Sequence, residues 1–307
     1  MRRPRALVVL NPAARHGLGG DLWQRVRREV EERFDGSIVQ TDLADRWRGE
    51  VDRALLSGVR IFVAAGGDGT VHALADALVE RHGELPLGDI RLGAVGLGSS
   101  NDFHKPFRTI LSGIPIRLDA ERARPRDLGR VRWIDGKGRG KTSVLVVSSS
   151  AGVVAEGNAL FSGCRLGRRL PVFLAIGVAA LRAIARHHPI QTLLAHDGMS
   201  ESVELSSLSI LKTPWLSGSL RYDVPVAPDD GLFGVGLCEG MGRWRLLATL
   251  ASLARGRFAG RPDTRAFRTA SLTLEADAPF LLEIDGEVDQ ARRASFDLLP
   301  ERMLACA

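Results

Sequence analysis

Along the first hundred residues, continuous apolar runs alternate with segments in which apolar residues recur at helical spacing. Apolar runs at residues 6–10 and 61–65 are typical of strands buried on both faces of a parallel sheet, and residues 37–41 and 91–95 indicate two more strands. Helices are predicted around residues 50–56 and from two sets of apolar residues spaced three or four apart among charges. The sets are Leu22, Val26, Val30 and Phe34, and Val71, Leu74, Ala75 and Leu78. This order predicts a parallel sheet with helices on both faces.

After about residue 125 the pattern changes to short strands separated by turns. Strands are predicted at residues 131–134, 143–148, 203–211, 220–226, 232–237, 271–275 and 280–284. The turn signals include Asp135-Gly136, Asp197-Gly198 and Asp230-Gly231. Helices are predicted over residues 168–186 and 243–255. This half is therefore predicted to be a β-rich antiparallel sandwich or barrel. A boundary near Arg124-Pro125 gives domains of residues 1–125 and 126–307.

Length and composition agree with two soluble domains. The chain has 307 residues, of which 45% are hydrophobic and 25% charged, and one domain takes about 150 residues. The net charge of +6 suits an anionic partner without choosing one. Three scattered cysteines without zinc-ligand spacing favour a reducing cytoplasm. The apolar run at residues 6–10 is too short for a secretory signal, and the run at residues 170–181 is too short to span a membrane.

The strongest candidate site is the glycine-rich turn Gly66-Gly67-Asp68-Gly69-Thr70 between a predicted strand and a predicted helix. Glycines let main-chain N–H groups approach a ligand closely, and the positive end of the helix dipole favours phosphate. Asp68 adds a carboxylate and Thr70 a hydroxyl. The alternative is that these two side chains only cap the helix.

Two more loops follow predicted strands of the same sheet. One runs from Gly96 to Phe103 and includes Ser99, Asn101 and Asp102, and the other covers residues 11–15. Loops at the carboxyl ends of parallel strands line one crevice, so all three loops are expected to face the same ligand. For residues 11–15 the alternative is a simple Asn-Pro turn.

Another candidate cluster, Asp285-Gly286-Glu287, directly follows the predicted strand at residues 280–284. Two carboxylates that flank a glycine could hold a magnesium ion or accept a proton from a hydroxyl group. The alternative is a hairpin turn, for which Asp-Gly is a strong signal.

These motifs, in this order, resemble the catalytic-domain family of diacylglycerol kinases, which includes bacterial lipid kinases and sphingosine kinases. The family pattern of an Asn-Pro loop, a Gly-Gly-Asp-Gly-Thr loop, a Gly-Thr-x-Asn-Asp-Phe loop and a late Asp-Gly-Glu matches residues 11–12, 66–70, 98–103 and 285–287. Residues 127–131 and 229–232 resemble further family segments, so the resemblance spans nearly the whole chain. The second motif alone is shared with NAD kinases.

The resemblance implies an NAD kinase-like α/β first domain that binds ATP and a β-sandwich second domain that takes the lipid acceptor. Roughly residues 288–307 would pack back on the first domain. The nucleotide-contacting positions it implies are Asn11, Pro12, Ala13, Ala14, Arg15, Thr41, Gly66, Gly67, Asp68, Gly69, Thr70, Val71, His72 and Ser99. Glu287 matches the general base, with Asp285 beside it, and Asp68 would help to orient magnesium or the nucleotide. Asp230, with backbone oxygens near Ala227 and Leu232, matches a structural magnesium site of the bacterial members.

The resemblance predicts a kinase that transfers the γ-phosphoryl group of ATP, with Mg²⁺, to the hydroxyl group of a diacylglycerol-like or sphingoid lipid. Such a protein would be cytoplasmic and would meet its lipid at the inner face of the membrane; no motif supports nucleic acid binding. The helix at residues 170–181, with Val172, Phe173, Leu174 and Ile176, would line the acceptor slot or form ordinary core. Neighbouring arginines at positions 165, 168, 169, 182 and 186 would contact an anionic bilayer or form a solvated face.

Departures from the family pattern keep two alternatives open. Arg15 stands where the family usually has glycine, Ser99 replaces threonine, and Ala73 replaces a common glutamate. The loss of that carboxylate leaves a catalytically impaired nucleotide-binding or lipid-binding regulator as one alternative. The shared phosphate loop leaves a soluble NAD kinase-like enzyme as the other. The lipid and the oligomeric state are not predicted.

Overall fold

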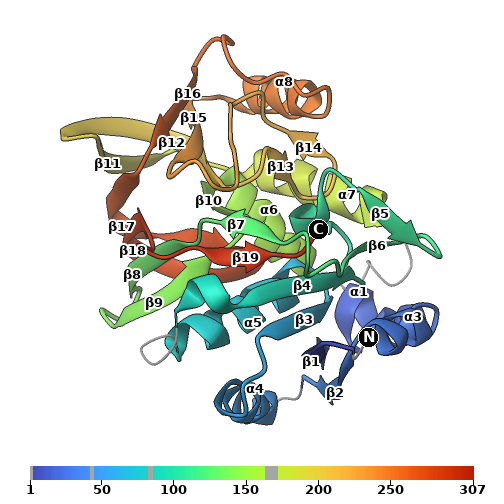
Figure 1. The fold of residues 1–307 in the computed structure, drawn as a ribbon. Coiled ribbons are helices and arrows are strands. Elements are labelled where there is room, and N and C mark those ends of the chain that lie inside the picture. The colour runs from blue at the N-terminus through green and yellow to red at the C-terminus, as the bar shows by residue number, and fades with distance from the viewer. Residues whose placement is uncertain (1–2, 42–44, 82–85, 163–171) are drawn as a thin grey trace. The chain divides into compact units, whose positions relative to one another are not determined.

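The computed structural model describes residues 3–41, 45–81, 86–162 and 172–307. The chain forms two compact units (Figure 1). Unit 1 consists of Met1–Leu128 and Pro300–Ala307, and unit 2 consists of Gly129–Leu299. No helix within the described residues is long and apolar enough to cross a membrane.

The sheet of unit 1 has a parallel centre, as the continuous apolar runs predict. Its strands β2 (Asp35–Gln40), β1 (Arg5–Leu10), β3 (Ile61–Gly66) and β4 (Arg91–Gly96) lie side by side in that order, and each neighbouring pair is parallel (Figure 1). Every residue of β3 is buried, which explains why its sequence shows no polar alternation.

Helices cover both faces of this sheet. The helices are α1 (Ala14–Gly17), α2 (Gly19–Gln24), α3 (Arg27–Arg33), α4 (Arg46–Leu56) and α5 (Asp68–Glu80), with 3₁₀ turns η2 (Leu87–Asp89) and η3 (Asp102–His104). Trp23, Val26 and Val30 share one core with Ala6 and Val8 of β1. Successive side chains of a strand point to opposite faces of the sheet, so the β1 side chains between these positions lie on the other face. On that face α4 contacts β1 and α5 contacts β3. The single helix predicted from Leu22 to Phe34 is therefore two short helices that keep one buried face.

The last residues of the chain complete the sheet of unit 1. β19 (Met303–Ala305) runs parallel to β4 and antiparallel to β7 (Arg124–Arg126). At its other half, β4 pairs with β6 (Ile114–Arg117), which pairs with β5 (Thr109–Leu111). The returning segment is shorter than the expected residues 288–307. Only residues 300–307 belong to unit 1, because residues 287–298 form a long strand of unit 2.

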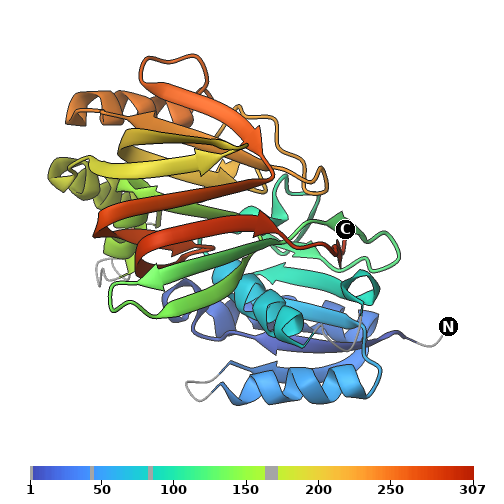
Figure 2. The ribbon, with the colours of Figure 1, turned by 90° about the vertical axis from the view of Figure 1, so that its left-hand side faces the viewer.

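Unit 2 is built on one antiparallel sheet, which has nine strands within the described residues. The strands are β8 (Gly129–Asp135), β9 (Gly140–Leu145), β10 (Ser148–Gly152), β11 (Ile190–His196), β12 (Met199–Leu211), β15 (Phe233–Glu239), β16 (Thr264–Thr269), β17 (Ser271–Ile284) and β18 (Glu287–Leu298). In Figure 2, β17 and β18, drawn in red, run beside β8 and β9, drawn in green.

This sheet is rolled so that distant strands share one core. A Cβ atom added to Gly129 of β8 would lie 3.0 Å from the ring of Phe233 in β15, although several strands separate β8 from β15 in the sheet order. Val131 and Val235 accordingly belong to the same apolar cluster. The prediction of a parallel α/β unit followed by a β-rich unit is confirmed.

Helices and a small hairpin add a second core to unit 2. α6 (Val153–Ser162), α7 (Val172–Arg186), α8 (Arg243–Leu253), β13 (Trp215–Leu216) and β14 (Leu220–Arg221) belong to this part. Val153, Ala183, Tyr222 and Leu246 are members of this core. Of the helix predicted over residues 168–186, α7 is described, and residues 168–171 lie outside the described residues, as does Cys164.

Two predicted strands of unit 2 differ from the structure for physical reasons. Residues 143–148 are split between β9 and β10, because the N–H groups of Val146 and Val147 bond a carboxylate instead of a neighbouring strand. Of residues 220–226 only β14 pairs. Val226 instead packs on the face of β15, where a Cβ on Gly234 would come within 2.3 Å of its side chain. The apolar residues of this segment are therefore explained by burial, and most of the segment does not pair with a neighbouring strand.

Candidate active site

The turn between β3 and α5 is built from glycines because side chains do not fit there. A Cβ atom on Gly66 would lie 2.2 Å from Oγ1 of Thr70. Gly67 precedes the first residue of α5, so the N-terminal end of this helix opens onto the turn. Free main-chain N–H groups and the helix dipole at such an end favour a bound anion.

The loop after β4 lies directly against this turn. A Cβ atom on Gly98 would come within 2.4 Å of the Cα atom of Gly67, so the two main chains touch where both residues are glycine. The N–H of Leu97 also donates to the carbonyl oxygen of Gly66 at 2.8 Å. The two glycine-rich loops predicted to meet at the carboxyl ends of β3 and β4 are therefore in backbone contact.

Asp68 joins the same two loops through its side chain. Its carboxylate accepts hydrogen bonds from the main-chain N–H groups of Asp102 at 3.0 Å and Phe103 at 2.9 Å. These bonds reach beyond a simple helix cap, and the predicted contact of Asp68 with magnesium or the nucleotide stays a prediction. Asp68 is a positioning residue that fixes the loop after β4 to the start of α5.

Two asparagines complete the connection of the three loops. Asn11 Nδ2 donates to Thr70 Oγ1 at 3.1 Å, and Asn11 Oδ1 accepts from the N–H of Ala13. Asn101 is buried and takes a left-handed φ of 50°. Its Oδ1 accepts from the N–H of Gly98, while its Nδ2 donates to the carbonyl oxygens of Gly96 and Gly98. Asn11 thus does more than form a turn.

Arg15 departs from the family's glycine at a position where the backbone favours glycine. Arg15, His16 and Gly17 all have positive φ, at 52°, 59° and 96°. A left-handed residue other than glycine costs about 1 kcal/mol. The Arg15 side chain is exposed at the loop after β1, and Thr41 follows β2 at the same edge of the sheet.

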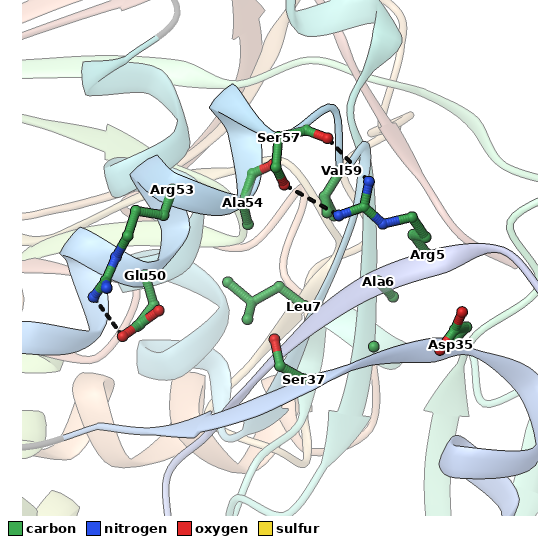
Figure 3. A pocket seen from close by; sticks show the side chains of 11 residues that line it. Arg5, Ala6, Leu7, Asp35, Ser37, Glu50, Arg53, Ala54, Ser57 and Val59 are labelled. Atoms are coloured by element: carbon green, nitrogen blue, oxygen red, sulfur yellow. Dashed lines mark hydrogen bonds and ion pairs between the residues drawn. The ribbon is translucent and has the colours of Figure 1, made fainter.

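A hollow of about 320 Å³ in unit 1 lies at the opposite edge of the sheet, near the start of β1 and β2 and the end of α4 (Figure 3). Both of its arginines already bind protein groups. Arg5 donates to the carbonyl and hydroxyl oxygens of Ser57, and Arg53 pairs with Glu50 at 2.5 Å. Ligands of parallel α/β sheets bind at the carboxyl ends of the strands, so this hollow is not the predicted nucleotide site.

In unit 2, Asp285-Gly286 is a two-residue hairpin turn, and the turn holds a carboxylate in a fixed position. Ile284 pairs with Glu287 across it, and φ is 49° at Asp285 and 98° at Gly286, as a type I′ turn requires. The buried Asp285 carboxylate accepts from three N–H groups. The donors are Val146 at 2.7 Å, Val147 at 2.7 Å and Ser148 at 2.9 Å. Asp285 is therefore an acceptor that anchors the turn.

Glu283, which belongs to none of the sequence motifs, anchors the turn a second time. It is buried, its Oε1 accepts from the N–H of Gly286 at 2.6 Å, and its Oε2 accepts from the hydroxyl of Ser150 at 2.7 Å. The available signal was an acidic residue inside the apolar run at residues 280–284, where a solvated carboxylate is not expected.

Glu287 is the one carboxylate of this turn that is exposed. It makes no hydrogen bond or ion pair with any residue that the structure describes. With Asp285 and Glu283 held by main-chain and side-chain donors, Glu287 has a fixed backbone and a side chain available to a ligand.

The predicted metal ligands around Asp230 are already bound to other groups. The Asp230 carboxylate accepts from the N–H groups of Ala227 and Leu232, both at 3.2 Å. The buried ammonium of Lys212 binds Asp230 Oδ1 at 3.2 Å and the carbonyl oxygen of Leu232 at 2.8 Å. Among the described residues, no three His, Cys, Asp or Glu side chains cluster in a way that could hold a metal. The oxygens predicted for magnesium hold a lysine instead, so the residues do not fit that ion.

Comparison with known proteins agrees with this architecture. Residues 5–131 match the family described as "Diacylglycerol kinase catalytic domain", and residues 147–306 match "YegS C-terminal NAD kinase beta sandwich-like domain". The second match alone covers more than half of the chain. The chain belongs to the diacylglycerol kinase catalytic-domain family. It is therefore a lipid kinase, and the family resemblance of its motifs is confirmed.

Relatives of this lipid kinase are distant in sequence but match over most of their length. "Probable lipid kinase YegS-like" of Stenotrophomonas maltophilia is 25% identical over 99% of this chain and 96% of its own. "Diacylglycerol kinase" of Staphylococcus carnosus is 21% identical over 96% and 92%. A diacylglycerol kinase structure from Bacillus anthracis superposes with a TM-score of 0.66 at 15% identity, covering 100% of this chain and 97% of its own. Yeast NADH kinase gives 0.51 at 10% identity over 100% and 84%, which shows a shared fold alone.

Proposed function

We propose that this lipid kinase transfers the γ-phosphoryl group of ATP to the hydroxyl group of a diacylglycerol-like or sphingoid lipid. The observation that carries the proposal is the Asp285–Glu287 turn. The buried carboxylates of Asp285 and of the preceding Glu283 fix the backbone, and the carboxylate of Glu287 is left exposed on that fixed backbone. This is the arrangement that a general base needs, because its carboxylate must meet a substrate hydroxyl without first leaving another partner.

The three joined loops of unit 1 are the proposed site for ATP, which supplies the phosphoryl group together with its magnesium ion. The N-terminus of α5 and the N–H groups of the turn at residues 66–70 would hold phosphate oxygens. Arg15, exposed on the loop after β1, would contribute a positive charge. Residues 11–15, Thr41, Val71, His72 and Ser99 belong to the same proposed contact set, and the ties made by Asp68, Asn11 and Asn101 hold the loops in place.

Contact with a membrane surface is proposed for α7 and α8 of unit 2. Trp244 of α8 is 85% exposed, and Leu174 and Leu181 of α7 are exposed at 45% and 54%. The two helices contact each other, and exposed arginines accompany these apolar side chains. The arginines are Arg182, Arg186, Arg243 and Arg245. Exposed aromatic and basic residues together suit an anionic lipid surface.

The exposure of two α7 side chains bears on the prediction that this helix lines the acceptor slot or forms ordinary core. Leu174 is exposed, and Ile176 is half-buried, so neither is ordinary core. The side chains of Val172 and Phe173 and the arginines at positions 165, 168 and 169 lie outside the described residues. An acceptor slot along α7 therefore stays a prediction.

A labelled-phosphate assay tests the function against its two alternatives. The full chain is incubated with [γ-³²P]ATP, Mg²⁺ and either mixed vesicles containing diacylglycerol, vesicles containing sphingosine, or NAD. Label in the organic phase is expected. Label on NAD would favour the NAD kinase-like alternative. ATP binding without any transfer would favour the impaired regulator that Ala73 suggests, and either result would refute the proposal.

Replacement of Glu287 by Gln is expected to lower kcat by about 10²-fold or more, because a positioned base contributes 10²–10⁴-fold. ATP affinity and the free energy of unfolding are expected to stay near the wild-type values, since the Glu287 side chain makes no hydrogen bond or ion pair with a described residue. Glu275→Gln, which removes an exposed carboxylate of the same sheet, is the control and should leave kcat unchanged. Equal turnover of Glu287→Gln and wild type would exclude Glu287 as the base.

A further inference from the structure

Lys212, which immediately follows β12, is a lysine whose side chain has no exposed surface. A buried ammonium is rare in proteins and is found where oxygen atoms surround it. Here it donates to Asp230 Oδ1 and to the carbonyl oxygen of Leu232. Both acceptors belong to one turn, residues 227–232, between β14 and β15.

The turn is organised around the Asp230 carboxylate. Besides the ammonium, this carboxylate receives the N–H groups of Ala227 and Leu232 and, at 2.5 Å, the guanidinium of Arg268 from β16. Burial acts to raise the pKa of Asp230, but the two N–H groups and the Lys212 ammonium outweigh it and hold the pKa below its usual value. Asp230 thus remains a carboxylate between two fixed cations.

This arrangement leaves no electrostatic need for a divalent ion. One carboxylate already faces two unit positive charges, and a third cation would be repelled by both. The chemistry of the donors is nevertheless that of a cation site, since it combines one carboxylate oxygen with one carbonyl oxygen. The cation that those oxygens bind is part of the chain.

Lys212 also connects this turn to the proposed catalytic turn. Its own N–H donates to the carbonyl oxygen of Val147 at 2.9 Å. The N–H of Val147 donates in turn to the Asp285 carboxylate. The side chain of Lys212 therefore binds the 227–232 turn while its main chain binds the segment that holds Asp285.

We propose that the Lys212 ammonium is the resident cation of the 227–232 turn, in place of a bound divalent metal, and that it positions the segment that holds Asp285. Lys212 is a positioning residue in this proposal, which stands whatever lipid the enzyme uses. The Mg²⁺ that the kinase needs would then be only that bound to its nucleotide.

The first test measures the thermal unfolding midpoint of the nucleotide-free, lipid-free full chain in EDTA and in millimolar Mg²⁺. Wild type and Asp230→Asn are compared. An equal response of the two proteins to Mg²⁺ is expected and supports the proposal, because it places no metal at this turn. A midpoint that rises with Mg²⁺ in wild type and not in Asp230→Asn would overturn it.

The second test removes the ammonium. Lys212→Ala is expected to lower the midpoint by at least about 5 °C, because it leaves Asp230 partly buried with one cation fewer. Mg²⁺ is expected to restore part of this loss, since the freed oxygens then have room for an ion. Lys141→Ala, which breaks a half-exposed ion pair with Asp289 in the same sheet, is the matched control and should show neither the loss nor the Mg²⁺ response.

An unchanged midpoint in Lys212→Ala would overturn the proposal, as would a loss that Mg²⁺ and Ca²⁺ both fail to reduce. Lys212→Met fills the same space without charge and should show the loss without the metal response. If neither Lys212 variant folds, the first test still shows whether a metal binds at this turn, because it compares wild type with Asp230→Asn in EDTA and in Mg²⁺. Activity provides a separate readout. In Lys212→Ala, assayed with Mg²⁺ equimolar to ATP, kcat is expected to fall while the KM for ATP stays within about twofold, and Mg²⁺ in excess of ATP should recover part of kcat.

Discussion

Two hairpins of the unit 2 sheet share a turn dipeptide and differ in what surrounds it. Asp197-Gly198 joins β11 to β12, and Asp285-Gly286 joins β17 to β18. Both aspartates have φ near 50° and both glycines have positive φ. Asp197 is exposed and bonds His196 and the hydroxyl of Thr269, whereas Asp285 is buried and bonds three main-chain N–H groups. The dipeptide encodes the turn, and the segment that packs against it, here residues 146–148, decides whether its carboxylate is buried and anchored.

The largest difference is expected when each aspartate is replaced by Asn. Asp285→Asn should destabilise the protein by at least about 3 kcal/mol, because it removes the charge from three hydrogen bonds and turns an NH₂ group toward N–H donors. Kinase activity should be lost with it. Urea unfolding followed by tryptophan fluorescence measures the first effect, and label transfer to lipid measures the second. If the Asp285→Asn protein were as stable as the Asp197→Asn protein, the three buried hydrogen bonds to Asp285 would contribute nothing to the free energy of unfolding.

A smaller effect is expected from Glu283, which has no counterpart in the β11–β12 hairpin, where Ala195 takes the equivalent place. Glu283→Gln keeps an acceptor for the N–H of Gly286 but loses its charge, so unfolding should become easier by about 1–2 kcal/mol. The turn should still form, and kcat should fall while the KM for ATP stays constant. Steady-state kinetics at saturating lipid would separate these quantities. A change confined to KM would contradict a positioning role.

The smallest effect is expected at Asp197. Hydrogen bonds from His196 and Thr269 lower the pKa of Asp197 below its usual value. A lowered carboxyl pKa gives stability that is present above the unfolded pKa and is lost as pH falls through the folded pKa. The side chain is half-exposed, so Asp197→Asn should cost less than about 1 kcal/mol at pH 7, and this difference should shrink below about pH 4. Urea midpoints of both proteins at pH 7 and pH 3 would check it, and a difference that grew in acid would refute the sign.

Local pattern was sufficient for the elements with strong periodicity. The strand at residues 61–65 was predicted because burial on both faces leaves a continuous apolar run, and the strand at residues 91–95 shows the same pattern after Arg91. β18 was not predicted, because its sequence is mostly polar and its buried positions are irregularly spaced. α6 was not predicted either. It follows the buried β10 without a polar break, and Gly157 lies inside it, so its helical period is weak.

The candidate site was predicted as a set of loops, while the partners of its side chains were not. Sequence pattern placed the glycine loops at one edge of a sheet, and the structure brings them into contact. The bonds from Asp285 to Val146, Val147 and Ser148 span nearly half the chain, and only the strand order of unit 2 brings these residues together. An acidic residue beside a glycine therefore indicated a turn, but the groups that its carboxylate binds depended on a distant segment of the chain.

The short strand β19 has a consequence for how the protein is made. Unit 1 takes its first 128 residues from the start of the chain, but β19 adds to β4 and β7 from residues 303–305. During synthesis, a ribosome must translate all of unit 2 before this strand is available. Until then the nascent first unit lacks the strand that pairs with Arg91 and Leu92 of β4, so its sheet is completed only after the whole of unit 2 has been translated.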